Sequence, residues 1–241
     1  SDANPFLVSN IRGAFTVLDI ITKQKKRMVQ ISTDEIFGSL SSNTATEESK
    51  LNPSSPYAAT KAAAELLINS YCVTHDSDVI ITRCTNNYGP RQFPEKLIPK
   101  IIILAKQGQK IPIYGKGRNI RDWIHVDDHC NGILSLLLDG KSGQSYNISG
   151  NNEMDNTTIV KRILDVMGKS EDLIEYVEDR PGHDFRYSMS SSKISKELGW
   201  KPKISFEEGI EKTVEWYLNH EEIWKDLSPK ILDSTPWKNQ V

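Results

Sequence analysis

The chain has 241 residues, 26% of them charged, and its formal net charge is −2 at pH 7. This composition is typical of a soluble globular protein with room for a sizeable buried core. The chain lacks the basic excess that binds nucleic acid, and no apolar run approaches the ~20 residues of a membrane span. Cys72, Cys84 and Cys130 form neither a metal-binding spacing nor a disulfide framework, which predicts no metal site and a cytoplasmic location.

The first 150 residues alternate between helical patterns and short apolar runs. Helices are predicted over residues 5–24, 56–74, 94–107 and 127–138. Buried strands are predicted over residues 27–33, 78–82 and 145–149. Asp127 or Asp128 is expected to cap the last of these helices. The alternation predicts an α/β fold with a doubly wound parallel sheet.

Residues from about 151 onward predict a smaller α+β lobe. Asn156 is expected to cap a helix, and Ser205 and Glu208 form a capping box at the start of another. Short strands are predicted near residues 174–177 and 186–189, with a short helix at 191–198. The segment from Lys225 has weak periodicity, and we interpret it as an arm that packs on the body or on a partner.

Tyr57 and Lys61 lie four residues apart at the start of a predicted helix. Ser55 is a suitable N-cap, and Pro56 suits the first helical position. Residues i and i+4 share one helix face, so the phenol and the ammonium can point at one ligand. A nearby cation and the positive helix end are expected to lower the pKa of the tyrosine, as a general base requires. The alternative is an ordinary amphipathic helix.

Two polar motifs follow predicted strands, where open α/β sheets bind their ligands. Thr33, Asp34 and Glu35 place two adjacent carboxyl groups at the first strand end, a candidate acid–base set. Asn86 and Asn87 offer amide donors and acceptors at the second. Each motif has an alternative interpretation as a plain turn.

Two further motifs carry cationic or titratable side chains. A Gly-rich basic loop over residues 114–118 leads to Arg121, and a guanidinium group binds phosphate oxygens bidentately. A tight turn holds Arg180 and His183. The basic loop could equally be a solvated hairpin, and the turn alone is a weak signal.

Five motifs occur along the chain: Thr33-Asp34-Glu35, Tyr57-x-x-x-Lys61, Asn86-Asn87-Tyr88-Gly89-Pro90, Arg121-Asp122-Trp123 and Arg180-Pro181-Gly182-His183-Asp184. In this order they resemble the extended short-chain dehydrogenase/reductase family, and most of all its dTDP-glucose 4,6-dehydratases. The acid pair is the specific part of the resemblance. Epimerases of the family usually lack it, and GDP-mannose dehydratases typically carry Thr-Ser-Glu.

The resemblance implies an NAD-dependent hydro-lyase that converts dTDP-glucose to its 4-keto-6-deoxy derivative in deoxysugar biosynthesis, for example of rhamnose. Tyr57 would deprotonate the sugar 4-hydroxyl, and Lys61 would lower the tyrosine pKa and hold the nicotinamide ribose. Glu35 would remove the C5 proton, Asp34 would protonate the departing C6 hydroxyl, and Thr33 would hydrogen-bond the 4-oxygen. The pair suits this division, since neighbouring like charges push one pKa upward.

Other positions match the binding residues of the family. Cofactor positions are Tyr57, Lys61, Asn87 and Ser9. Substrate positions are Thr33, Asn86, Lys96, Leu97, Pro112, Tyr114, Arg121, Asn156, Arg180 and His183. The resemblance also implies a homodimer that uses the Tyr57 helix. It divides the chain into part of a Rossmann-type NAD domain (residues 1–92 and 120–150) and a nucleotide-sugar lobe (residues 93–119 and 151–241).

The chain departs from the family pattern in two ways. It has no Gly-x-x-Gly-x-x-Gly motif for the cofactor pyrophosphate, so we expect it to be an N-terminally truncated dehydratase that is inactive alone. Arg83 stands where close relatives often carry a small polar residue, which puts the site wall near Asn86 in doubt. Two other interpretations stay open: a UDP-glucose dehydratase or nucleotide-sugar 4-epimerase, and an inactive fragment or binding module.

Overall fold

Three parallel strands form the central sheet of the protein. The computed structural model describes residues 3–180 and 182–233, so Pro181 of the fifth motif and residues 234–241 of the predicted arm lie outside it. The strand order is β1 (Met28–Thr33), β2 (Val79–Cys84) and β6 (Ser145–Ile148). These are the three strands predicted from the apolar runs, and both pairings are parallel.

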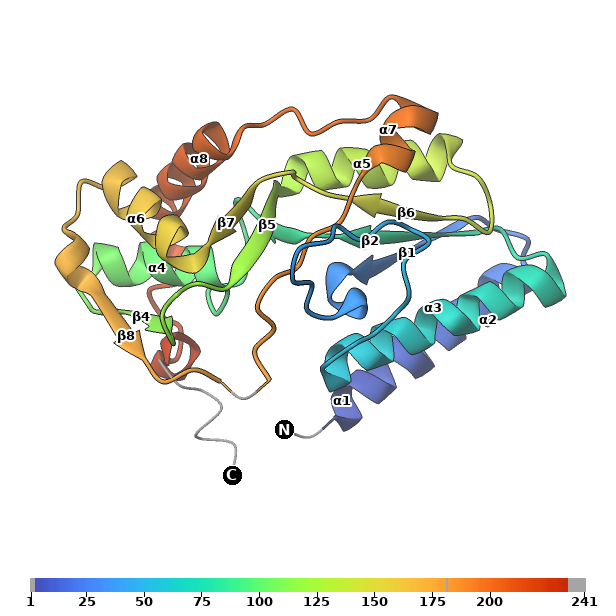
Figure 1. The fold of residues 1–241 in the computed structure, drawn as a ribbon, viewed down its shortest axis with the longest axis horizontal. Helices are drawn as coiled ribbons and strands as arrows, with labels where there is room; N and C mark the ends of the chain where they lie inside the picture. The colour runs from blue at the N-terminus through green and yellow to red at the C-terminus, as the bar shows by residue number, and fades with distance from the viewer. Residues whose placement is uncertain (1–2, 181, 234–241) are drawn as a thin grey trace.

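Helices cover both faces of this sheet (Figure 1). The N-terminal helical region runs through α1 (Asn4–Phe6), a π-helical stretch (Leu7–Gly13) and α2 (Ala14–Lys23). With α3 (Pro56–His75) it covers one face, while α5 (Val126–Asp139) and α7 (Ser192–Leu198) cover the other. Helices on both faces of a parallel sheet define a doubly wound fold, and the predicted fold class is confirmed.

A second lobe surrounds its own apolar core. Strand β5 (Ile120–His125) pairs with β3 (Asn86–Tyr88) in parallel and β7 (Glu153–Asp155) in antiparallel orientation, and β4 (Ile111–Tyr114) pairs with β8 (Ile174–Val177). Helices α4 (Leu97–Lys106), α6 (Asn156–Val166) and α8 (Phe206–Asn219) complete the core. Short 3₁₀ helices occupy Asp34–Phe37, Glu171–Leu173, Glu221–Ile223 and Pro229–Leu232.

Some local predictions were wrong. The cap of α5 is His125, whose side chain accepts from the Asp127 amide, and the cap of α6 is Asp155 rather than Asn156. In both cases the cap is the last extended residue of the preceding strand, and its side chain reaches the free amides first. Residues 186–189 do not form a strand: Arg186 and Met189 each make only an isolated bridge. By contrast, Ser55 and Ser205 cap α3 and α8 as predicted.

A buried ion pair joins α3 to the central sheet. Arg83 of β2 donates through Nε and Nη2 to Glu65 of α3, and the closest contact is 2.8 Å with side chains 6% and 1% exposed. The remaining terminal nitrogen donates to the Glu47 carbonyl, and the guanidinium lies over the Phe37 ring. The doubt about Arg83 is thereby resolved, because its side chain faces the α3 helix.

Breaking this pair from one side is predicted to destabilise the protein strongly. Glu65→Gln leaves the Arg83 charge buried without its counter-ion, which costs about 3–5 kcal/mol of unfolding free energy. Urea unfolding monitored by circular dichroism measures this. Asp19→Asn, which breaks the exposed Lys23–Asp19 pair on α2, is the matched control and is expected to leave the midpoint unchanged. Equal midpoints for Glu65→Gln and wild type would contradict the prediction.

Candidate active site

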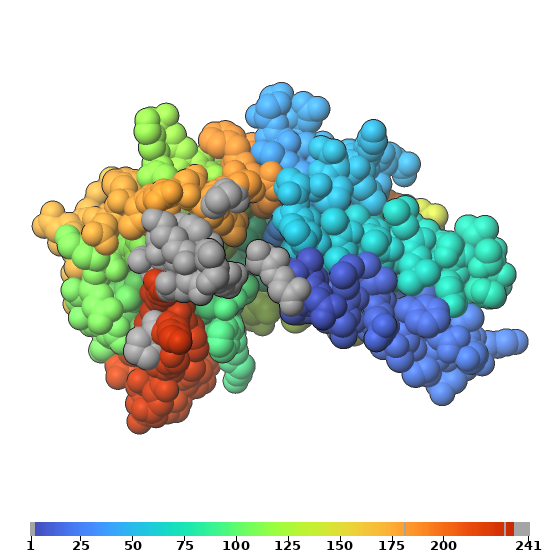
Figure 2. All heavy atoms as spheres, turned by 90° about the horizontal axis from the view of Figure 1, so that it is seen from below, coloured from blue at the N-terminus to red at the C-terminus, as the bar shows by residue number. Residues whose placement is uncertain are grey.

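A cavity of about 1050 Å³ lies where the second lobe meets the N-terminal helical region. Figure 2 shows a recess on this side of the molecule, between the blue N-terminal helices and the red C-terminal segment. Eight residues predicted as substrate positions line the cavity: Asn86, Lys96, Leu97, Tyr114, Arg121, Asn156, Arg180 and His183. Pro112 and Ser9 are not among its lining residues. The Oγ atom of Ser9 donates to the Pro5 carbonyl instead.

The acid pair lies beside this cavity, at the carboxyl end of β1. Thr33 ends the strand, and its Oγ1 accepts from the Glu35 amide and donates to Asp34 Oδ1 at 3.2 Å. Asp34 is only 4% exposed, and its Oδ2 has no hydrogen-bond partner within the described chain. Burial, followed by the nearby Glu35 charge, raises the pKa of Asp34 to about 8. At pH 7 this carboxyl group therefore carries a proton.

Glu35 has a different electrostatic environment. Burial raises its pKa, but the charges of Arg180, Arg121 and Lys96 oppose this shift. All three cations line the cavity, and their charges act on the Glu35 carboxyl group beside it. The two adjacent carboxyl groups thus differ in surroundings: burial holds Asp34 neutral, whereas for Glu35 nearby cations oppose the effect of burial.

Tyr57 and Lys61 lie in the first turns of α3, as the sequence predicts. The expectation of a lowered tyrosine pKa is wrong for the residues of this chain. Burial, and then the charges of Glu35, Cys84 and Asp34, raise the pKa of Tyr57 to about 12. The Nζ atom of Lys61 donates to the Ile31 carbonyl at 3.0 Å, and burial lowers the pKa of this lysine. The positive charge of Lys61 therefore does not offset the desolvation of the phenol.

Asn86 and Asn87 lie in different surroundings. Asn86 lines the cavity, whereas the Oδ1 atom of Asn87 is buried without a partner among the described residues. Cys84, which ends β2, was not predicted as a site residue. It is half-buried, desolvation raises its pKa to about 12, and its charge would act on both Tyr57 and Lys61. Its position at a strand end was the available signal, but a lone cysteine carries none of the usual catalytic patterns.

The cavity cations differ in their protein partners. Arg121 donates to the carbonyls of Ile120, Asp184 and Phe185, and its guanidinium lies 4.3 Å from the Tyr187 ring centre. His183 pairs through Nδ1 with Asp179 at 2.7 Å. The Asn156 Oδ1 atom is buried and unpaired within the described chain. Sequence reasoning missed Phe6, Glu95, Lys100, Trp123, Lys230 and Ile231, which also line the cavity.

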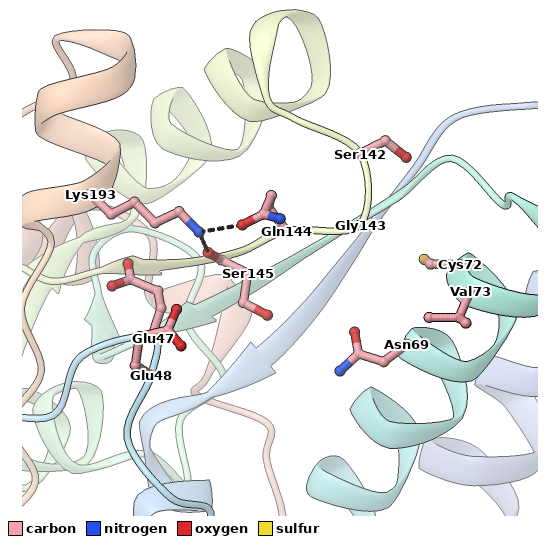
Figure 3. Close-up of a pocket in the computed structure, with 10 residues that line it drawn as sticks. All are labelled: Glu47, Glu48, Asn69, Cys72, Val73, Ser142, Gly143, Gln144, Ser145 and Lys193. Carbon is pink, nitrogen blue, oxygen red and sulfur yellow. Dashed lines mark hydrogen bonds between the residues drawn. The ribbon is translucent and has the colours of Figure 1, made fainter.

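A second hollow of about 470 Å³ lies at the other end of the molecule, between α3 and the loop before β6 (Figure 3). It contains none of the motif residues, and its lysine, Lys193, donates to Gln144 and to the Ser145 carbonyl. The motif residues that line a cavity are therefore found in the larger one.

Comparison with known proteins agrees with this geometry. A family model described as GDP-mannose 4,6 dehydratase matches residues 1–213. The dTDP-glucose 4,6-dehydratase of Streptomyces griseus is 45% identical over 229 residues, which cover 95% of this chain and 70% of that protein. The chain belongs to the 4,6-dehydratase family. The resemblance drawn from the five motifs is confirmed.

Solved structures of the family have the same fold. A dTDP-glucose 4,6-dehydratase from Bacillus anthracis in complex with NAD is 46% identical with a TM-score of 0.91, and the match covers 95% of this chain and 73% of that one. DesIV, a dTDP-glucose 4,6-dehydratase from Streptomyces venezuelae with NAD bound, is 43% identical with a TM-score of 0.92 and coverages of 94% and 70%. This dehydratase chain thus spans about 70% of the length of such relatives.

Other kinds of site are not found in the part of the chain that the structure describes. No helix there is long and apolar enough to cross a bilayer. No group of three or more His, Cys, Asp or Glu side chains there could hold a metal ion.

The raised pKa of Asp34 predicts a pH-dependent stability. In the unfolded chain this carboxyl group ionises near pH 4, whereas in the folded protein it ionises near pH 8. The folded state holds one more proton between these values, so this contribution to stability is complete below pH ~4 and lost by pH ~8. Asp34→Asn removes the group. The unfolding free energy of wild type should therefore fall relative to that of Asp34→Asn across this range.

Urea unfolding of both proteins at several pH values measures this difference, and the remaining titrating groups are common to the two. Parallel stability curves between pH 4 and pH 8 would show that Asp34 ionises normally in the folded protein.

Proposed function

We propose that the enzyme carrying this chain dehydrates dTDP-glucose to dTDP-4-keto-6-deoxyglucose with NAD as its cofactor, in deoxysugar biosynthesis. The observation that carries the proposal is the acid pair. Asp34 is held protonated by burial, and the adjacent Glu35 has cations that oppose its burial, side by side next to a cationic cavity. Removal of water from C5 and C6 of a sugar needs one group to accept a proton and another to donate one.

The first proton transfer is assigned to Tyr57, which accepts the proton of the sugar 4-hydroxyl. Thr33 lies beside the acid pair and would hydrogen-bond the 4-oxygen once its hydroxyl proton turned from Asp34 Oδ1 to the substrate. Bound NAD would supply hydride acceptance at C4, hydride return at C6 and a positive charge near Tyr57. Such a charge favours the phenolate form and opposes the burial that raises the pKa of Tyr57.

The elimination is assigned to the carboxyl pair. A ketone at C4 acidifies the C5–H bond, and Glu35 accepts that proton. The C5 electron pair forms the C5–C6 double bond as the C6–O bond breaks. Asp34 donates its proton to the departing hydroxyl, which leaves as water. The unpartnered Oδ2 of Asp34 is free for that donation.

The nucleotide end of the substrate fits the cationic side of the cavity. Arg121, Arg180 and Lys96 provide positive charge for the diphosphate. Asn86, Asn156 and His183 provide polar groups along the same lining, and Leu97 and Tyr114 provide apolar surface. Pro112 lies on β4 beside Tyr114, and we assign it to the outer wall near the base.

The residues around Tyr57 fit a nicotinamide cofactor. Lys61 has one hydrogen bond, to the Ile31 carbonyl, and so keeps donors for a ribose hydroxyl. Asn87 keeps a buried acceptor oxygen without a partner in the described chain. Tyr57, Lys61 and Asn87 would hold the nicotinamide half. Ser9 would join them only if its hydroxyl left the Pro5 carbonyl.

The same proposal extends to domains, assembly and location. Residues 1–92 and 120–150 would bind NAD, and residues 93–119 and 151–241 would bind the nucleotide sugar. A homodimer through α2 and α3 would cover apolar side chains that these helices expose, including Phe15, Val17, Leu66 and Val73. The three free cysteines suit a reducing cytoplasm.

A related dehydratase that acts on UDP-glucose would use the same acid pair, and product analysis with dTDP-glucose and UDP-glucose side by side separates the two. A 4-epimerase is disfavoured, because moving a hydride at C4 requires no acid at C6. The protonated Asp34 would then have no function.

Glu35→Gln is predicted to abolish dehydration. Loss of a general base costs about 10²- to 10⁴-fold in rate, so formation of the 4-keto-6-deoxy product from dTDP-glucose should fall by this factor. Product is measured by chromatography and NMR with NAD supplied. Glu48→Gln, an exposed carboxylate outside the cavity, is the control and should retain the wild-type rate. A Glu35→Gln enzyme within twofold of wild type would rule out Glu35 as the base.

A further inference from the structure

The C-terminal arm, residues 225–233, forms part of the cavity wall. Its 3₁₀ turn at Pro229–Leu232 lies below β4 and β8, in red in Figure 1. Two residues of this turn, Lys230 and Ile231, line the same cavity as Arg121 and Arg180. The sequence left open whether the arm packs on the body or on a partner, and the described part of it packs on the body.

The arm is fixed in place by contacts on both sides of the turn. Trp224, just before it, is 6% exposed, and its ring nitrogen donates to the Tyr217 carbonyl at 3.0 Å. Leu227 and Leu232 pack against the apolar core of the second lobe. Lys100 of α4 donates to the Asp233 carbonyl. With these residues turned to the body, Lys230 and Ile231 are left on the cavity side.

The cations of the cavity are not equally available to a ligand. Lys96 is paired with Glu95 at 2.9 Å, and Lys100 is occupied by the Asp233 carbonyl. Arg121 donates to three backbone carbonyls. Within residues 3–180 and 182–233, only Arg180 and Lys230 among the lining cations have side chains without a hydrogen bond or ion pair. They come from segments about fifty residues apart in the sequence.

We propose that Lys230 is a substrate-binding residue that contacts the diphosphate of the nucleotide sugar together with Arg180. This rests on the proposed function, to which it adds a residue from outside the five motifs. A diphosphate presents oxygens to more than one side, and a lysine binds such a group as a mobile point charge, while an arginine binds it bidentately. The docked arm holds that charge at the cavity.

Calorimetric titration with dTDP, which contains the diphosphate but requires no turnover, tests the proposal on the chain itself. Lys230→Ala is expected to weaken dTDP binding about fivefold, the value of one partly exposed charge contact. The affinity should also depend less steeply on salt than that of wild type. Lys225→Ala, which removes an equal charge from the same arm outside the cavity lining, should bind dTDP as wild type does.

Arg180→Ala separates a failure of the Lys230 assignment from a failure of the proposed function. If Arg180→Ala weakens dTDP binding and Lys230→Ala binds as wild type, Lys230 has no binding role while the proposed function stands. If Lys225→Ala weakens binding as much as Lys230→Ala, the effect is one of general charge and the proposal is overturned. If the wild-type chain does not bind dTDP, this cavity is not a diphosphate site in the chain, and the assignment of Lys230 is overturned.

Discussion

The ion pair between Arg83 and Glu65 fixes the geometry on which the site depends. Arg83 belongs to the central strand β2 and Glu65 to the helix that carries Tyr57 and Lys61 in its first turns. The same guanidinium holds the Glu47 carbonyl, in the loop that follows the acid pair. A buried ion pair adds little net stability compared with apolar packing, but it tolerates few alternative arrangements. The Arg83 side chain thus fixes the positions of α3, β2 and the loop at Glu47 relative to one another.

Burial and nearby charges give two neighbouring carboxyl groups different electrostatic environments. Asp34 is buried, and desolvation keeps it protonated, whereas Glu35 is partly exposed and the charges of the cavity cations oppose the rise of its pKa. The 3₁₀ turn that begins after Thr33 produces this difference, because consecutive side chains of such a turn point in different directions. Proton donor and proton acceptor therefore follow from backbone geometry and need no difference in residue chemistry.

Local signals made much of this predictable from the sequence. Apolar runs located the three central strands, Ser55 and Pro56 located the start of α3, and strand-end position pointed to the acid pair. The family resemblance then supplied eight of the residues that line the cavity. The prediction for Tyr57 failed because helix position and a neighbouring lysine are local features, whereas desolvation depends on the tertiary fold. Lys230 was not predicted as a cavity residue for the same reason, because only the docking of the arm brings it to the cavity.

The central claim is that burial holds Asp34 protonated at neutral pH, beside a second carboxyl group whose burial is opposed by cations. A carboxyl ¹³C NMR titration of the chain, with signals assigned by Asp34→Asn and Glu35→Gln, measures both groups in one sample. The account predicts that Asp34 titrates near pH 8 and that the pKa of Glu35 also lies above the usual range of a glutamate. Two carboxyl groups that both titrate below pH 5 would contradict it.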